Sequence, residues 1–523
     1  MRAKLNNVNT TDIREAIRLG CHTMSSIFNA DDHDIPYQQS HVIPEALLAW
    51  TANHSESHVP GRDLNALLNA RDAAGITIDE QAIEKHARAA FFSYSGPVPL
   101  PLNRQEKGGK LIRLVPHNIR EGFHALYALA HFHNSTQARD LAQKSIQTIF
   151  NRWDPRHGWD RNHLEAELGL KVIKSTFIVG LGRSIGPLIK LYRTTGMEQA
   201  LELALVLKDK AINEFFQEDG KYDSDLFGTH THSTTSVMSS LAQLADLLHD
   251  SATMDRVRAF YDHGLWKIRD ALGWVIEMSG DQANPDRGES NCTGDIVETA
   301  MILGRWGYTE YYEDAERILR CHLLPSQLRD ISFIKEPDNP DNVDAKKDVA
   351  HRLLGSFGFP APWGHEHLGA QRKGFHMDSV GSVVGSLCEV YRAMIRSDRA
   401  GHWVTLLFDH ETQAVAVESP YTHPCLRVKV KQPGPLFVRI PSWVDLAKVK
   451  LHGTTQEPCH TNGYLFLPSP PRDQWISFDF PLDRRELVLQ HQTRDVRTRL
   501  RGDEVVAMDN FGADLTFFNR IDQ

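Results

Sequence analysis

Several protein classes are excluded by what this sequence has little of. No apolar run approaches the roughly 20 residues needed to cross a bilayer. Lys and Arg total 58 against 67 Asp and Glu, a net charge of −9, whereas proteins that bind a phosphate backbone need an excess of basic residues. The first residues, MRAKLNNVNTTDIREAI, lack the apolar stretch of a secretory signal. We therefore expect a cytoplasmic protein without nucleic-acid or membrane partners.

Cysteine is also scarce, and its spacing excludes the common cysteine frameworks. The six cysteines are scattered and form no Cys-x-x-Cys pair. Such a pattern predicts reduced thiols rather than disulfides. The hydrophobic content of 41% is nevertheless sufficient for a large core, and 523 residues suggest more than one domain.

A helical hairpin recurs between about residues 117 and 400. Each copy has a small-residue-rich apolar helix, a short polar turn and a more amphipathic helix, and the copies begin at His117, Arg183, Thr234, Gly294 and Gly381. The first four starts lie about 50–65 residues apart, which indicates stacked supersecondary units. The segment before residue 110 is expected to supply the opening hairpin or hairpins. Six such units close into an (α/α)6 toroid, so we predict a mainly α domain over residues 1–400.

The pattern changes after about Arg399. Short runs that alternate between apolar and polar residues, such as AVAVES and CLRVKVK, are separated by Pro- and Gly-containing turns. This period of two indicates an antiparallel β-sandwich, which we expect over residues 401–523.

Candidate functional residues collect where the predicted inner helices begin. In an (α/α)6 toroid these N-terminal turns meet around one opening, the mouth, and their free N–H groups favour acidic and hydroxyl-bearing ligands. Asp378 and Thr234 are equally consistent with ordinary helix N-caps. The whole set favours a functional site, because buried acids, imidazoles and guanidinium groups are costly; it comprises His117, Asn118, Arg120, Glu121, Arg183, His230, His232, Glu289, Cys292, Asp295, His376 and Asp378.

The chain resembles the family 127-like glycoside hydrolases, which include β-L-arabinofuranosidases. The resemblance lies in ordered stretches from about residue 115 to 490: PHNIREGFHALYAL, FGTHTHSTTSVMSSL, ESNCTGDIVETAMILGRWGYTEYYEDAERIL and FVRIPSW. His230 matches the His of the family's Gly-x-His-x-Asn-Thr segment, and Cys292 matches the Cys of its Glu-Thr-Cys helix. The resemblance implies a toroid with a C-terminal sandwich and an enzyme that hydrolyses glycosidic bonds.

The departures from that family concern its cysteines. The family's arabinofuranosidases use a Cys nucleophile from a Cys-Cys pair and hold zinc with three Cys and a Glu. Here Ser290 stands where that Glu would be, and Phe375-His376 stands where the Cys-Cys pair would be. A tetrahedral zinc site needs about four ligands. We therefore predict catalysis without thiol, metal or cofactor, with Cys292 in the wall of the site.

Carboxylates are left to perform the chemistry. Glycosidic cleavage ordinarily needs one protonated acid and one carboxylate that activates water or attacks carbon. Glu121 and Asp295 are expected in first turns of different hairpins, where they could face each other, and we predict that they form the catalytic pair. Glu289, Asp378 and Asp160 are the alternatives.

Basic residues suggest the substrate. Arg62, Arg120 and Arg183 could bind a sugar carboxylate bidentately, while His58, His117, His230 and His232 suit hydroxyl groups. The stretches SHVPGR and HNIREGFHAL resemble the β-glucuronidase branch of the superfamily, family 154. We thus expect hydrolysis of a terminal uronic acid from an oligosaccharide or glycoconjugate. A β-L-arabinofuranosidase-like hydrolase, an unsaturated uronyl hydrolase and a non-catalytic carbohydrate-binding protein are the alternatives, and homo-oligomerisation is left open.

Overall fold

Six helices form a closed ring in the computed structural model, which describes residues 4–369, 373–491 and 493–521. Each ring helix contacts the next, and the last contacts the first. These inner helices are α2 (Val59–Ala74), α4 (Ile119–Phe132), α6 (Ile185–Thr195), α9 (Thr231–Leu248), α11 (Ser290–Arg305) and α14 (Met377–Ala393). The five that were expected from hairpin recurrence all lie in this ring, and α2 is the sixth.

A second helix packs outside each inner helix. The outer helices are α1 (Ile13–Met24), α3 (Glu80–Ser93), α5 (Thr136–Arg152), α7 (Glu198–Glu214), α10 (Ser251–Asp262) and α12 (Glu310–Ile318). Five of them follow their inner partner in sequence. Helix α1 instead packs on α14 and α2, so the beginning of the described chain completes the hairpin that α14 begins.

Burial explains which helices are inner and which are outer. Along α9, fourteen of the eighteen residues are buried, as its apolar and small residues on nearly all sides require. Helix α5 buries only Ala138, Ala142, Ser145, Ile146 and Ile149. This i, i+4, i+7, i+8, i+11 spacing is one stripe of an amphipathic helix, and the rest of α5 faces solvent.

Short strands and helices connect the ring helices. Strand β3 lies beside the start of α14, because Gln39 pairs with His376 through the backbone. The connecting elements are β1 (Phe28–Asn29), β2 (Ile35–Pro36), β3 (Gln39–His41), β4 (Leu47–Ala49), β5 (Leu102–Arg104), β6 (Leu111–Leu114), β7 (Trp153–Asp154), β8 (Gly158–Trp159), β9 (Lys171–Val172), α8 (Ser224–Phe227) and α13 (Val349–Arg352).

Two five-stranded sheets follow the ring. One has the order β10 (Ile395–Asp398), β11 (Gly401–Val404), β15 (Leu436–Arg439), β18 (Tyr464–Leu467), β17 (Cys459–Thr461). The other has the order β12 (His410–Glu411), β13 (Val415–Glu418), β14 (Leu426–Val430), β19 (Trp475–Asp479), β16 (Lys450–His452). Apolar side chains of both sheets, among them Val438 and Val428, share one buried cluster. Adjacent strands are antiparallel except β11 and β15.

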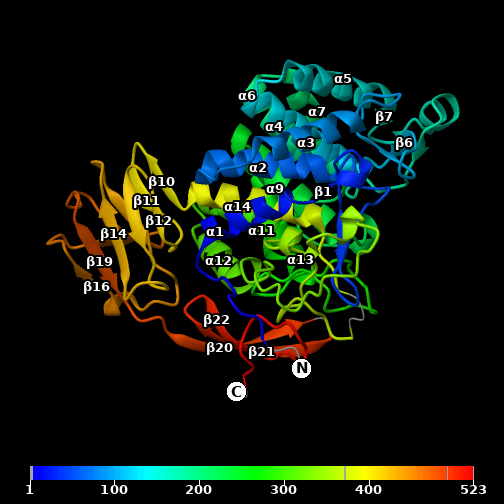
Figure 1. The fold of residues 1–523 in the computed structure, drawn as a ribbon. Helices are drawn as coiled ribbons and strands as arrows, with labels where there is room; N and C mark the ends of the chain where they lie inside the picture. Colours follow the sequence, from blue (N-terminus) through cyan, green and yellow to red (C-terminus); the bar gives the residue numbers. More distant parts are fainter. Residues whose placement is uncertain (1–3, 370–372, 492, 522–523) are drawn as a thin grey trace.

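The last three strands are not part of the two five-stranded sheets, although a single sandwich was expected over all of residues 401–523. Strands β20 (Arg484–His491), β21 (Arg494–Arg501) and β22 (Glu504–Met508) form a sheet of their own beside the helical region (Figure 1). Its Val496 and Leu500 pack with Trp363 and with Leu5 near the start of the chain. Alternation in the sequence identifies strands, but it does not say which strands share a sheet.

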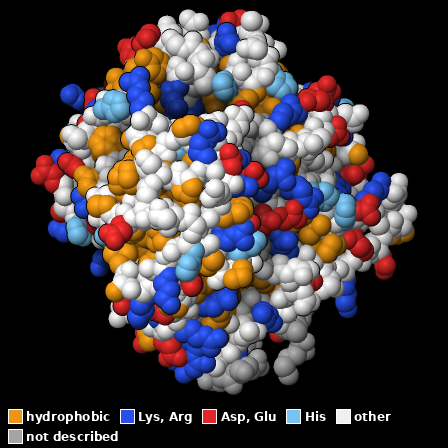
Figure 2. Space-filling model, turned by 90° about the vertical axis from the view of Figure 1, so that its left-hand side faces the viewer, with side chains coloured by type: hydrophobic (Ala, Val, Ile, Leu, Met, Phe, Trp, Pro, Cys, Tyr) orange, Lys and Arg blue, Asp and Glu red, His pale blue; other side chains and the backbone are white. Residues whose placement is uncertain are grey.

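Charges of both signs lie side by side on the surface. Figure 2 shows this for the face on the side of the two five-stranded sheets. Strand residues there pair across strands, as in Arg427–Glu418 and Lys431–Glu411, both at 2.9 Å. Among the described residues, no helix has the length and apolar character needed to cross a membrane.

Candidate active site

The inner helices begin without capping side chains. In the described structure, none of their six N-cap side chains accepts a hydrogen bond from a backbone N–H of its own helix, whereas Asp12, Asp79, Ser135 and Asp250 cap outer helices. Asp378 lies in the first turn of α14, whose N-cap is His376, and it bonds other segments. The capping interpretation of Asp378 is therefore wrong, and connecting segments satisfy first-turn N–H groups instead, as in the bond from Met377 N to the Gln38 carbonyl.

Three arginines converge on Glu121, which is fully buried. Its Oε1 accepts from Arg62 Nη2 and Arg183 Nη2, both at 3.1 Å, and from Arg120 Nη1 at 3.2 Å. Gly61 permits this convergence, because a Cβ there would lie 1.9 Å from the Glu121 carbonyl oxygen. Close packing of α2 against α4 thus brings Arg62 to the carboxylate.

This environment determines the protonation of Glu121. Burial works to raise the pKa of its carboxyl, but Arg183, His58, Arg62 and Arg120 outweigh burial and hold that pKa well below its usual value. A carboxylate that stays ionised beside three guanidinium groups is a poor proton donor. The geometry therefore favours Glu121 as the anchor of the arginines, in contrast to its predicted role in acid–base catalysis.

Asp378 is the second ionised carboxylate of the mouth. Its Oδ1 accepts from Gln38 Nε2 at 2.9 Å, and its Oδ2 lies 3.3 Å from His58 Nε2 and 3.4 Å from Arg62 Nη1. Burial works to raise the pKa of Asp378, but the nearby His58 imidazole and the charge of Arg62 outweigh burial, so the net pKa lies well below the usual value. Gln38 also lies 3.3 Å from His376 Nδ1, which places His376 at the edge of the mouth.

Two further carboxyls flank His232. Its Nδ1 lies 3.8 Å from Glu289 Oε1, and its Nε2 lies 3.5 Å from Asp295 Oδ2. Burial, reinforced by the charges of Glu277 and Asp378, raises the pKa of Glu289 to about 8. Burial likewise raises the pKa of Asp295 to about 7, against the opposing charge of Arg120. Near neutral pH the mouth therefore holds two ionised carboxylates and two carboxyls that can exchange protons.

Histidines line the rest of the mouth. His58 stacks on His117 with ring centroids 5.3 Å apart, and His117 meets His230 edge-on at 5.4 Å. Asn118 Oδ1 lies 2.9 Å from His58 Nδ1. Burial lowers the pKa of His230 to about 3 and that of His117 well below its usual value. These imidazoles are neutral near pH 7 and can donate or accept hydrogen bonds with sugar hydroxyls.

The donors do not fit the zinc site that the family resemblance implies. Cys292 is fully buried, and burial followed by the charge of Glu289 raises the pKa of its thiol well above the usual value. Its Sγ lies 3.5 Å from Thr231 Oγ1. Among the described residues, two sets have the spacing for a metal ion, namely His54, His58, His117 and His230, His232, Glu289, but neither contains sulfur.

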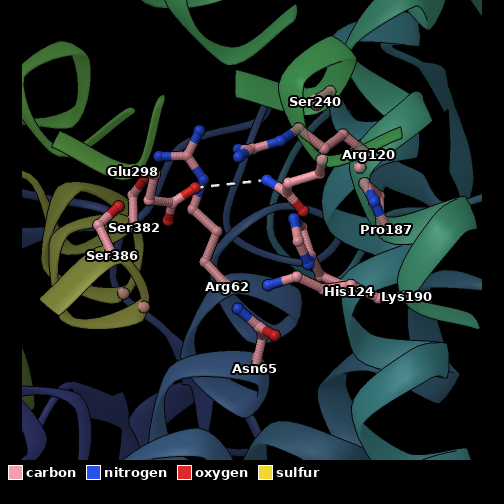
Figure 3. A pocket seen from close by; sticks show the side chains of 14 residues that line it. Arg62, Asn65, Arg120, His124, Pro187, Lys190, Ser240, Glu298, Ser382 and Ser386 are labelled. Carbon is pink, nitrogen blue, oxygen red and sulfur yellow. Dashed lines mark hydrogen bonds between the residues drawn. The ribbon is translucent and has the colours of Figure 1, made fainter. Parts of the chain in front are cut away.

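A small polar cavity lies along the ring axis behind the mouth (Figure 3). Its volume of about 30 Å³ has room for about two water molecules. Arg62 and Arg120 line it together with Glu298, which lies one helical turn beyond Asp295 on α11. Glu298 Oε2 accepts from Ser239 Oγ at 2.9 Å, and its charge helps to raise the pKa of Asp295. The floor of the mouth is thus polar.

Several residues of the mouth escaped the sequence prediction. Gln38 and Glu277 lie in connecting segments without a recognisable motif. His54 precedes His58 by four residues in HSESH, which is one helical turn, so this spacing was a usable signal. Asp160, considered as an alternative acid, lies elsewhere and pairs with Arg152 at 3.4 Å.

Comparison with known proteins identifies the fold. No family model and no curated protein matches the sequence. A GH127 β-arabinofuranosidase matches the structure with a TM-score of 0.56 and 14% identity, over 94% of this chain and 78% of that one. A GH127 β-L-arabinofuranosidase from Geobacillus stearothermophilus T6 gives 0.57 and 12%, over 94% and 80%, and a structure described as a glycoside hydrolase gives 0.55 and 12%, over 86% and 76%. The chain therefore has the fold of the GH127 β-arabinofuranosidases, as the sequence resemblance predicted.

Proposed function

We propose that this protein is a glycoside hydrolase that removes a terminal uronic acid from an oligosaccharide or glycoconjugate, at the mouth of an (α/α)6 toroid. The observation that carries the proposal is the arrangement of Glu289 and Asp295 on either side of His232, both buried and both with pKa values raised toward neutrality. Glycosidic bonds are usually cleaved by two carboxyl groups, one kept protonated and the other kept ionised by its surroundings.

The two pKa values suggest the roles. Glu289, with a pKa of about 8, keeps its proton at pH 7 and is suited to protonate the leaving oxygen. Asp295, with a pKa of about 7, is substantially ionised there and is suited to act as the base. Asp295 thus keeps the role predicted for it, and Glu289 takes the place of Glu121.

A buried donor without a partner favours an anionic sugar. Arg62, Arg120 and Arg183 bring three positive charges, while Glu121 and Asp378 are the carboxylates with lowered pKa values. With Glu289 protonated and Asp295 ionised, the charges of the mouth balance, so the preference for an anion rests on the hydrogen-bonding capacity of the arginines. Arg120 Nε is buried without a hydrogen-bond partner in the described structure, and its side chain is 12% exposed. A uronate carboxylate would supply the missing acceptor.

Hydrolysis of paired aryl glycosides tests the substrate class. We expect an aryl uronide to be cleaved at least about tenfold faster, as kcat/KM, than the neutral glycoside of the same ring configuration, since one charge-assisted hydrogen bond contributes about 1.5–3 kcal/mol. Arg120→Ala should raise KM for the uronide more than for the neutral glycoside. Equal cleavage of both substrates by the wild type would contradict the proposal.

Amide substitutions test the catalytic pair. Glu289→Gln and Asp295→Asn retain volume but remove proton transfer, so each should lower kcat by about 10²–10⁴-fold. Asp160→Asn is the matched control, because this acid is exposed and distant from the mouth. Full turnover by both amide variants, with an unchanged melting temperature, would exclude this pair.

A cysteine-dependent arabinofuranosidase mechanism is not favoured. Such a nucleophile must be a thiolate, whereas the pKa of Cys292 is raised well above its usual value by burial. The second thiol of the family's pair is replaced by Phe375-His376.

A further inference from the structure

A second cavity adjoins the mouth on the side of His376. Its volume is about 560 Å³, and Lys373, Arg287, His41, His367, Phe359 and His376 are among the residues that line it. We refer to it as the Lys373 cleft. Phe359 meets His376 edge-on with ring centroids 4.4 Å apart, and His376 contacts Gln38, which bonds Asp378. The cleft and the mouth therefore share one wall.

The cationic side chains of the cleft have different surroundings. Arg287 pairs with Glu277 at 2.9 Å and places its guanidinium 4.3 Å from the Phe359 ring. Lys373 is 6% exposed. Its Nζ lies 5.7 Å from the Phe375 ring, and within residues 4–369, 373–491 and 493–521 no carboxylate forms an ion pair with it. Burial lowers the pKa of the Lys373 ammonium to about 7, although the charge of Glu366 opposes this shift, so an anion bound beside Lys373 would favour its charged form.

A buried ammonium group without a counter-ion is costly, and it is retained where a ligand supplies the opposite charge. The backbone of Lys373 is fixed, since Val42 N donates to its carbonyl at 2.8 Å and its own N–H donates to Ile43 at 3.3 Å. The described lining of the cleft contains no Asp or Glu. An anion that enters the cleft therefore meets two cations and an aromatic face with no competing carboxylate in its wall.

We propose that the Lys373 cleft binds an anionic substituent, a carboxylate or a sulfate, on the sugar that leaves after cleavage. The preferred substrate is then an acidic oligosaccharide rather than a uronide of a neutral sugar. This inference rests on the proposed function for its biological meaning, but the binding site itself is defined by Lys373, Arg287 and the shape of the cleft.

Direct binding tests the cleft without turnover. The parent protein for calorimetry is Arg120→Ala, which lacks the proposed preference of the mouth for anions. This parent and its Lys373→Met and Lys373→Arg derivatives are titrated with a neutral hexose, its 6-sulfate and the corresponding uronate. Lys450→Met in the same parent is the matched control, because Lys450 is exposed on β16. We expect the parent and the control to bind an anionic sugar at least about tenfold more tightly than the neutral one, with loss of this preference in Lys373→Met and its retention in Lys373→Arg. The stronger of the two anions identifies the substituent.

Kinetics then separate the cleft from the mouth. Lys373→Met should raise KM about 10- to 100-fold for a disaccharide that carries an acidic group on its leaving sugar, and change kcat/KM for an aryl uronide by less than about twofold. If no uronide is cleaved but the Lys373-dependent binding persists, the proposed function fails and the cleft remains. If the Arg120→Ala parent binds neutral and anionic sugars equally, or if its Lys373→Met derivative folds and keeps the preference for anions, the cleft proposal is overturned.

Discussion

Two of the buried arginine–glutamate clusters in the described structure differ in how completely their polar atoms are paired. One is the mouth of the ring. The other lies at the junction between α12 and the five-stranded sheets, where Glu316 Oε1 accepts from Arg320 Nε and Nη2 at 3.0 and 2.9 Å. Glu316 Oε2 accepts from Leu407 N at 3.0 Å and from Arg439 Nη2. Both oxygens of the junction carboxylate are thus occupied.

The junction is further packed by aromatic rings. The Arg320 guanidinium lies 3.7 Å from the Phe408 ring centroid and 3.8 Å from that of Tyr421, and its Nη2 also donates to the Leu407 carbonyl at 2.8 Å. At the mouth, by contrast, buried atoms of several side chains lack a hydrogen-bond partner within the described ranges: Glu121 Oε2, Glu289 Oε2, His58 Nε2, His232 Nε2 and Arg120 Nε. At the junction, Arg439 Nη1 likewise lacks a hydrogen-bond partner. The polar atoms of the junction are thus mostly satisfied within the protein, whereas the mouth keeps several that a ligand would satisfy.

The largest effect expected from this comparison is on stability at the junction. Glu316→Gln removes the shared counter-ion of two buried arginines and should lower the free energy of unfolding by about 3–5 kcal/mol, measured by urea denaturation. Glu310→Gln on the same helix is the control, since its side chain is 62% exposed. The kcat of the folded fraction should not change. A loss of stability below about 1 kcal/mol would show that the paired contacts of the junction are not what stabilises it.

A smaller loss of stability is expected at the mouth. Glu121→Gln also deprives arginines of a counter-ion. Arg62 still donates a hydrogen bond to the Asp378 carbonyl oxygen, however, and Arg183 still donates one to the His117 carbonyl oxygen at 2.8 Å. The expected loss is about 1–3 kcal/mol, accompanied by a higher KM for a uronide because the arginines are displaced. The control is the pH profile of kcat, whose limbs should keep their positions. If Glu121→Gln instead abolished one limb, Glu121 would be the acid or base.

The mildest perturbation is a change of pH, which alters the mouth and leaves the junction intact. The proposed mechanism uses ionised Asp295 and protonated Glu289, so kcat/KM should rise with pH up to about 7 and fall above about 8. Asp295→Asn should remove the acidic limb from the residual activity, and Glu289→Gln the alkaline one. A profile that is flat between pH 6 and 9 would contradict these roles.

The sequence predicted the ring better than it predicted the chemistry. Each hairpin is formed by residues that are close together in the sequence, so its pattern can be recognised locally. The starts expected near Arg183 and Thr234 accordingly correspond to α6 and α9. The partnership of α1 with α14 is not local, and no pattern in the sequence announces it. The same holds for the sheet of β20, β21 and β22, whose apolar face packs with Leu5.

The roles of the carboxyls depend on contacts between different hairpins. Glu121 and Glu289 are both acids at the start of an inner helix, and their sequence context does not distinguish them. In the structure, arginines from α2, α4 and the segment before α6 surround Glu121, whereas Glu289 faces histidines and other acids. Their pKa values therefore shift in opposite directions, and the sequence of a single segment does not predict the direction of such a shift.

Closure of the ring by α1 has a consequence for synthesis. Helix α1 emerges from the ribosome early, but its packing surface on α14 does not exist until residue 393 has been made. At about 5–20 residues per second, that interval lasts about 20–80 s. Arg62 meets the carboxylate of Asp378 only at the same late moment, so the nascent chain can stack its hairpins but cannot assemble a complete mouth. The buried face of α1, with Ile13, Ile17 and Met24, is a surface that a chaperone would have to shield during this time.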